Sequence, residues 1–82
     1  MGLLIRGSVG PLVRTLQEDL TALGYVVEPD GVYGAATEEQ VKSFQDTYGL
    51  DPDGKAGAAT QAKIAELREE IADMRAKDDA AS

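Results

Sequence analysis

Asp30-Gly31-Val32-Tyr33-Gly34-Ala35-Ala36-Thr37 returns 23 residues later as Asp53-Gly54-Lys55-Ala56-Gly57-Ala58-Ala59-Thr60, with six of the eight positions identical. The similarity continues downstream, since Val41 and Phe44 correspond to Ile64 and Leu67 at the same interval. Glycine accepts the positive φ angle that a tight reversal needs, and alanine opens a helix at low entropic cost. The repeat therefore predicts two copies of one turn followed by one helix.

Helical periodicity surrounds the repeated unit. A turn cluster at residues 7–10 precedes Pro11, and proline is favoured in the first turn of a helix. Apolar residues then recur at spacings of three, four and three, at Val13, Leu16, Leu20 and Leu23. Gly24 follows the last of them, and glycine commonly ends a helix. We therefore expect helices over about residues 11–23, from 35 to Gly49, and from 58 to about Lys77.

These elements predict an all-α fold. It is a small three-helix bundle built on the duplicated turn-helix unit, with an extended C-terminal helix. The first helix must cover the apolar face that the two repeated units share, because neither unit can bury it alone. We expect residues 1–67 to form the domain, residues 68–77 to extend the third helix, and residues 78–82 to form a flexible tail.

Composition narrows the classes of function. The 82 residues include 15 acidic and 8 basic side chains, a net charge of −7, and neither cysteine nor histidine. An acidic chain is a poor partner for nucleic acid and for anionic membrane surfaces. No apolar run approaches the roughly 20 residues of a membrane span, so we expect no membrane insertion. The short apolar start at residues 1–6 predicts no signal peptide and leaves the localisation unknown.

Catalysis and cofactor binding are not expected. A glycosidase needs two carboxyl groups facing each other across a substrate cleft, and a bundle this small offers no deep cleft for pairs such as Glu38 and Asp53. The loop at residues 51–54 resembles a calcium loop weakly, but Ala62 stands where an EF-hand requires glutamate. We therefore predict no enzyme activity, no cofactor and no metal.

The motifs of the chain, taken together, resemble a known family. They are Gly7-x-x-Gly10-x-x-Val13-x-x-Leu16-Gln17-x-x-Leu20, Gly24-Tyr25, Asp30-Gly31-x-Tyr33-Gly34-x-x-Thr37, Val41-x-x-Phe44-Gln45, Gly49-Leu50 and Asp53-Gly54-x-x-Gly57-x-x-Thr60. This pattern, over about residues 4–67, is similar to the peptidoglycan-binding type 1 domain. The resemblance implies a non-catalytic three-helix module that anchors amidases, carboxypeptidases and phage lytic enzymes to the bacterial cell wall.

The resemblance also implies a ligand surface. It is a shallow groove beside the first turn and the start of the next helix, with peptidoglycan glycan or stem peptide as the partner. Matching positions are Asp30, Gly31, Tyr33, Gly34 and Thr37. A tyrosine ring can stack on an acetylated sugar, and hydroxyl and backbone N–H groups can bond amide oxygens. The turn can equally serve only as a helix-entry device, although Ala56 replaces the Tyr33 ring in the second copy.

The third helix continues past the end of the family pattern. Ile64, Leu67, Ile71 and Met74 keep an a/d spacing. The end of this helix can fold back to shield the first helix, or Ile71 and Met74 can form a surface for self-association or for a protein partner. The second possibility gives an alternative function, a structural adaptor such as a component of a phage particle or injection machine. The site of action is then the bacterial envelope or a phage particle.

Overall fold

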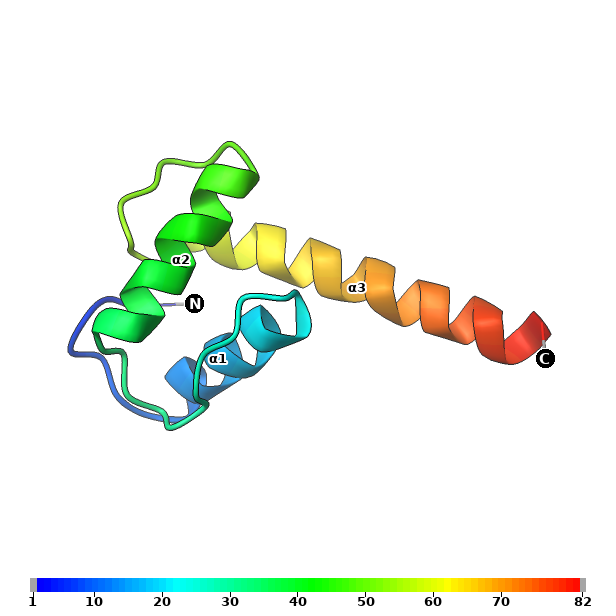
Figure 1. The fold of residues 1–82 in the computed structure, drawn as a ribbon, viewed down its shortest axis with the longest axis horizontal. Coiled ribbons are helices and arrows are strands. Elements are labelled where there is room, and N and C mark those ends of the chain that lie inside the picture. Colours follow the sequence, from blue (N-terminus) through cyan, green and yellow to red (C-terminus); the bar gives the residue numbers. More distant parts are fainter. Residues whose placement is uncertain (1, 82) are drawn as a thin grey trace.

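The structure is a computed structural model that describes residues 2–81, with side chains placed for residues 2–72. It contains three helices, α1 (Pro11–Ala22), α2 (Ala35–Thr47) and α3 (Ala58–Ala81), and no regular β-strand within the described part. The all-α prediction is confirmed. Figure 1 shows α1 and α2 beside the first half of α3, whose second half extends past both. None of the described helices is long and apolar enough to cross a membrane.

Both shorter helices end in the same motif. The Gly24 N–H donates to the Thr21 carbonyl at 3.1 Å, and the Tyr25 N–H donates to the Leu20 carbonyl at 2.8 Å. Gly49 and Leu50 repeat this pattern at the end of α2. The two glycines have φ angles of 98° and 72°, in the left-handed region where a side chain is disfavoured. The predicted helix-stopping role of both glycines is therefore confirmed.

The N-terminal segment joins the two turns. The Leu4 N–H donates to the Ala56 carbonyl at 3.1 Å, and the Ala56 N–H donates back to Leu4 at 2.8 Å. Val9 forms a second antiparallel bridge with Val32, where the Tyr33 N–H donates to the Ser8 carbonyl at 2.9 Å. Sequence reasoning missed both bridges, because each is a single pair with no strand periodicity. They hold the two copies of the turn against one common segment.

The core sits where the three helices and the two turns meet. Its buried residues come from all three helices and from the two segments that connect them. They are Val13, Leu16, Leu20, Val27, Tyr33, Val41, Phe44, Ala56 and Ile64. The predicted stripe of the first helix is present, with Leu23 packed at the margin of the core. The Tyr25 ring meets the Phe44 ring edge-on, with centroids 5.6 Å apart.

The third helix is longer than the sequence predicted. It runs to Ala81, where a tail from residue 78 had been expected. Glycine and proline are absent from residues 58–81, so no local signal stops the helix at Lys77. Arg68 lies 3.3 Å from the Asp19 carboxylate and ties α3 to α1.

Candidate functional site

The first turn is organised around Asp30. One carboxylate oxygen, Oδ1, accepts hydrogen bonds from the Val32 N–H at 3.0 Å and from the Gln17 amide at 3.1 Å. These donors lower the pKa of Asp30 below its ordinary value of 3.8, with the Val32 N–H as the largest cause. Gly31 has a φ of 76°, and a Cβ there would lie 3.3 Å from the Gly10 carbonyl oxygen. Glycine is required here both by its conformation and by the close backbone.

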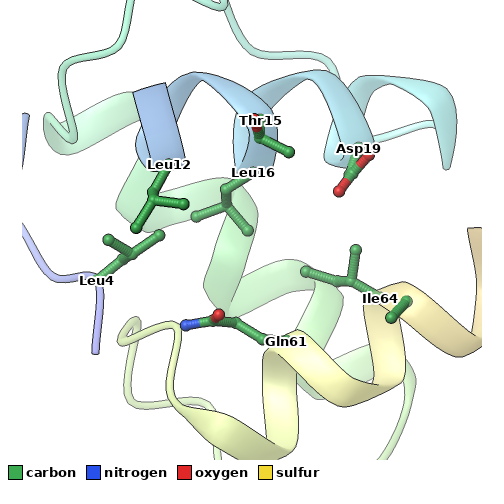
Figure 2. Close-up of a pocket in the computed structure, with 8 residues that line it drawn as sticks. Leu4, Leu12, Thr15, Leu16, Asp19, Gln61 and Ile64 are labelled. Carbon is green, nitrogen blue, oxygen red and sulfur yellow. The ribbon is translucent and has the colours of Figure 1, made fainter. Parts of the chain in front are cut away.

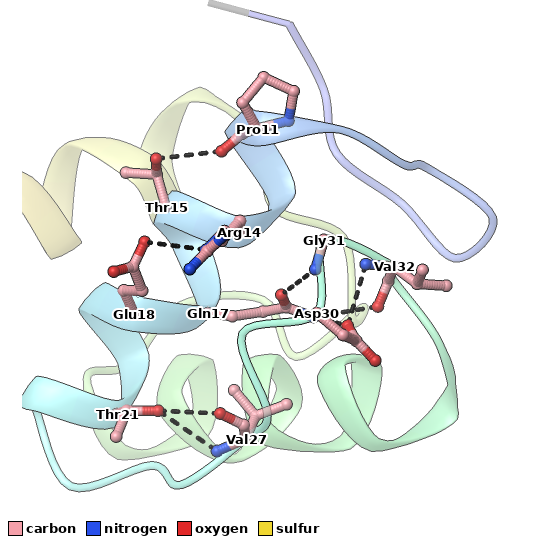
Figure 3. Close-up of polar contacts among 10 residues, drawn as sticks. All are labelled: Pro11, Arg14, Thr15, Gln17, Glu18, Thr21, Val27, Asp30, Gly31 and Val32. Carbon is pink, nitrogen blue, oxygen red and sulfur yellow. Dashed lines mark hydrogen bonds and ion pairs between the residues drawn. The ribbon is translucent and has the colours of Figure 1, made fainter.

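Gln17 of α1 fills the inside of this turn (Figure 3). Its Oε1 accepts from the Gly31 N–H at 2.9 Å. Its Nε2 donates to Asp30, to the Val32 carbonyl at 3.0 Å and to the Thr37 hydroxyl at 3.0 Å. A single amide therefore joins α1, the turn and the start of α2.

The second turn contains the same network. Gln45 of α2 accepts from the Gly54 N–H at 3.0 Å and donates to Asp53, to the Lys55 carbonyl and to Thr60 at 2.9–3.0 Å. Asp53 also accepts from the Lys55 N–H at 2.9 Å, and its pKa is lowered mainly by that bond. The sequence repeat is therefore a repeat of a buried hydrogen-bond network, with one glutamine at the centre of each copy.

A shallow hollow of about 280 Å³ lies at the first turn and the start of α2. We call it the first hollow; its lining residues are Val27, Glu28, Asp30, Val32, Gly34, Ala35, Ala36 and Thr37. The opening N–H groups of a helix have no intrahelical partner, and Gly34 supplies no side-chain cap to α2. The first hollow therefore combines backbone donors, two acidic side chains and the half-exposed Val32 side chain.

A corresponding hollow of about 390 Å³ lies at the second turn. It includes Asp53, Gly57, Ala58, Ala59 and Thr60, which occupy the repeat positions of Asp30, Gly34, Ala35, Ala36 and Thr37. We call it the second hollow. Its wall differs from that of the first hollow, because Leu3, Leu50 and Lys55 contribute to it. The two hollows have similar backbones and different side-chain chemistry.

Tyr33 does not lie at the ligand surface that the family resemblance implies. Its side chain is only 1% exposed and sits in the core, so its ring cannot stack on a ligand in this structure. The hydroxyl donates to the Gly54 carbonyl at 2.6 Å and so links the first turn to the second. Burial, followed by the nearby Glu38 and Asp53 carboxylates, raises its pKa. One tyrosine therefore links both turns, and Ala56 stands at the matching position of the second copy.

The other predicted residues divide between the hollow and the interior. Asp30 and Gly34 line the first hollow at its surface, whereas Thr37 lines it but is buried, with its hydroxyl engaged by Gln17. Gly31 shapes the turn and does not line the hollow. Sequence reasoning missed Gln17 and Gln45 as network centres. The sequence does contain a signal for this role. Each glutamine directly follows an apolar core residue, and each is followed along the chain by an Asp-Gly turn. In both turns a threonine lies seven residues after the aspartate.

The predicted partner surface is described only in part. Ile71 is half-buried on α3, and the side chain of Met74 lies outside the described residues. Within residues 2–72 no group of three or more carboxylate, histidine or cysteine side chains could hold a metal ion.

The chain is similar to a known protein family. The family model described as a putative peptidoglycan-binding domain matches residues 9–64. No curated protein sequence matches significantly.

Several solved structures are similar to this chain. A peptidoglycan-binding protein from Clostridioides difficile, crystallised with glutamine hydroxamate, is 41% identical with a TM-score of 0.79, over 80% of this chain and 42% of that one. The SleB N-terminal domain is 36% identical with a TM-score of 0.77, over 80% of this chain and 92% of that domain. A Burkholderia AP3 phage endolysin is 40% identical with a TM-score of 0.75, over 77% of this chain and 24% of that one. The chain thus spans less than half the length of the first and third of these proteins.

Proposed function

Because this chain belongs to the peptidoglycan-binding domain family, we propose that it binds bacterial cell-wall peptidoglycan without catalysing a reaction, and that the first hollow holds the ligand. Family membership supports the partner. The position of the first hollow, at the turn where the family pattern implies a ligand surface, supports the site.

The observation that carries the proposal is the mixture of groups in the first hollow. The free N–H groups of Ala35 and Ala36 can donate to the carbonyl oxygens of acetamido, lactyl or peptide groups. The Asp30 carboxylate uses Oδ1 within the turn, and its other oxygen can accept from a sugar hydroxyl or a peptide N–H. Val32 offers a half-exposed apolar surface to a methyl group. Tyr33 and Thr37 act from beneath by holding the turn in place.

A pull-down with insoluble sacculi tests this function. Ala36 and Ala59 are exposed, lie at matching positions of the two helix starts and line the first and second hollow respectively. Glutamine keeps the charge and the helical propensity at both positions. We expect Ala36→Gln to weaken binding about tenfold, equivalent to about 1.4 kcal/mol, while Ala59→Gln binds like the unmodified chain. No retention of the unmodified chain at low and moderate salt would sink the proposal.

A second candidate is a structural adaptor, and the length of α3 favours it. The family match ends at residue 64, whereas α3 has 24 residues and continues to Ala81. A helix that extends past its own bundle offers a surface that other proteins can contact. Ile71 and Met74 are the residues that we propose for this contact, with a second copy or a larger assembly such as a phage particle as the partner. Binding to the wall and assembly through α3 use different surfaces and are compatible.

A further inference from the structure

An apolar groove of about 160 Å³ opens between α1 and α3 (Figure 2). It shares no lining residue with the first or the second hollow. Leu12 and Leu16 approach it from α1, Ile64 approaches it from α3, and Leu4 closes one end. Leu16 and Ile64 are nearly fully buried and form the floor, whereas Leu12 is 63% exposed. The groove therefore has a packed floor and one apolar side chain held at its mouth.

The polar side chains at the edge of the groove can only accept further hydrogen bonds. Thr15 donates its hydroxyl hydrogen to the Pro11 carbonyl at 3.0 Å. The side-chain amide of Gln61 donates to the Gly2 carbonyl at 2.9 Å and to the Ala56 carbonyl, so both of its hydrogens are engaged. Asp19 contributes a carboxylate. Each of these three polar side chains therefore has only acceptor capacity left for an incoming molecule.

Asp19 marks the position where a positive charge would be favoured. One of its oxygens, Oδ1, lies 3.3 Å from Arg68 Nε, and the second oxygen of a carboxylate can accept further hydrogen bonds. Partial burial raises the pKa of this carboxyl despite the neighbouring guanidinium. An approaching lysine or arginine would stabilise the ionised form. The net charge of −7 on the chain also favours a basic partner.

We propose that this groove is a docking site for a basic amphipathic helix of a partner protein. An apolar anchor of that helix lies between Leu12, Leu16 and Ile64, and a lysine or arginine on its flank pairs with Asp19. The partner supplies the donors that the acceptor-only edge lacks. Recognition of this kind, with an amphipathic helix laid into a hydrophobic groove, needs few anchors and tolerates a shallow receptor. It leaves both hollows free, so docking and wall binding can occur together.

Amide chemical shifts of the full ¹⁵N-labelled chain test the proposal. The probe is a synthetic amphipathic peptide of leucine, alanine and lysine, and the matched probe carries glutamate in place of every lysine. We expect the lysine peptide to shift amides at residues 12–19 and 61–65, and the glutamate peptide to leave them unchanged. Shifts spread evenly over the surface, or equal shifts from the two peptides, would overturn the proposal.

The variant Leu12→Glu separates docking from nonspecific charge attraction. Leu12 is exposed, so the variant keeps the fold, and the added carboxylate strengthens any general attraction for a cationic peptide. We expect the affinity for the lysine peptide to fall about tenfold or more, while sacculus binding is unchanged. Unchanged or tighter peptide binding by Leu12→Glu contradicts the proposal. Shifts at the same residues when the chain alone is concentrated would identify a second copy as the occupant and also contradict it.

Discussion

Gln17 and Gln45 are the residues on which both turns depend. Each is 0–1% exposed, and each amide satisfies a glycine N–H, an aspartate, a carbonyl and a threonine hydroxyl. A buried amide is costly unless it is hydrogen-bonded. Among the described side chains no buried polar atom lacks a partner. The networks therefore fix the turns geometrically, because any displacement of a turn leaves several polar groups unpaired.

Replacing Gln17 with methionine tests this dependence. Methionine keeps the length of the side chain and removes its hydrogen bonds, so the Gly31 N–H and the Thr37 hydroxyl lose their partner. We expect the free energy of unfolding to fall by about 2–3 kcal/mol, the scale of unsatisfied buried polar groups. Urea unfolding measures the loss. Arg14→Met on the exposed face of α1 is the matched control and should change stability by less than about 0.5 kcal/mol. A similar small effect for Gln17→Met would contradict the structural role.

Residue roles were harder to predict from the sequence than residue positions. Asp30 and Gly31 were placed correctly in a turn, because their conformational preferences are local. Tyr33 was expected at the surface and lies in the core, since its burial depends on the Gly54 carbonyl, 21 residues away in the chain. An absent ring in the second copy looked like a sign of ligand contact. The structure instead gives the Tyr33 ring a structural role, because its hydroxyl donates to the Gly54 carbonyl of the second turn.

At the scale of elements, the helices were predictable and their connections were not. Proline, glycine and apolar spacing located the starts and ends of α1 and α2 to within a few residues. The two single-pair bridges of Leu4 and Val9 had no periodic signal. The length of α3 was underestimated because no residue marks its end. Local signals thus define elements, whereas the contacts that hold the turns together arise from the tertiary structure.

The two turns give the fold a defined dependence on pH. The pKa values of Asp30 and Asp53 are lowered from 3.8 by backbone N–H donors and by the two glutamines. The unfolded chain therefore binds protons at a higher pH than the folded chain, and stability is lost as the pH falls below the ordinary aspartate value. We expect the Asp30→Asn, Asp53→Asn double variant to be less stable at neutral pH and to lose less stability on acidification. Urea unfolding at neutral and acid pH measures both quantities.

Asp19 provides a control of opposite sign. Burial raises its pKa, so the folded chain holds the Asp19 proton more tightly than the unfolded chain does. This group therefore offsets part of the acid destabilisation. Asp19→Asn should make the acid loss steeper, whereas the double variant makes it shallower. The same slope in all three chains would mean that these carboxyl groups do not govern acid unfolding.

At the scale of the whole molecule, the fold separates a compact bundle from a projecting helix. Every core and core-flanking apolar residue of the described side chains lies between Leu4 and Leu67. The longest dimension of the molecule is 44 Å, against 26 and 22 Å for the other two, and Figure 1 shows α3 along it. The bundle contains the groups proposed for wall binding. The projecting part of α3 is available for the adaptor role.

Removing residues 73–82 separates these two parts experimentally. Because the described core ends at Leu67, we expect the shortened chain to unfold with a free energy within about 1 kcal/mol of the full chain, a change of no more than about 4–8 °C in melting temperature. Ile64→Ala is the positive control, since truncating a buried isoleucine costs about 2–5 kcal/mol.

If α3 mediates assembly, the full chain forms defined oligomers in sedimentation experiments, and both the shortened chain and Ile71→Glu with Met74→Glu remain folded monomers. A shortened chain that loses more than about 2 kcal/mol would instead mean that residues 73–82 stabilise the bundle. A full chain that stays monomeric at high concentration, with no partner recovered, would remove the adaptor role and leave wall binding as the function of the bundle.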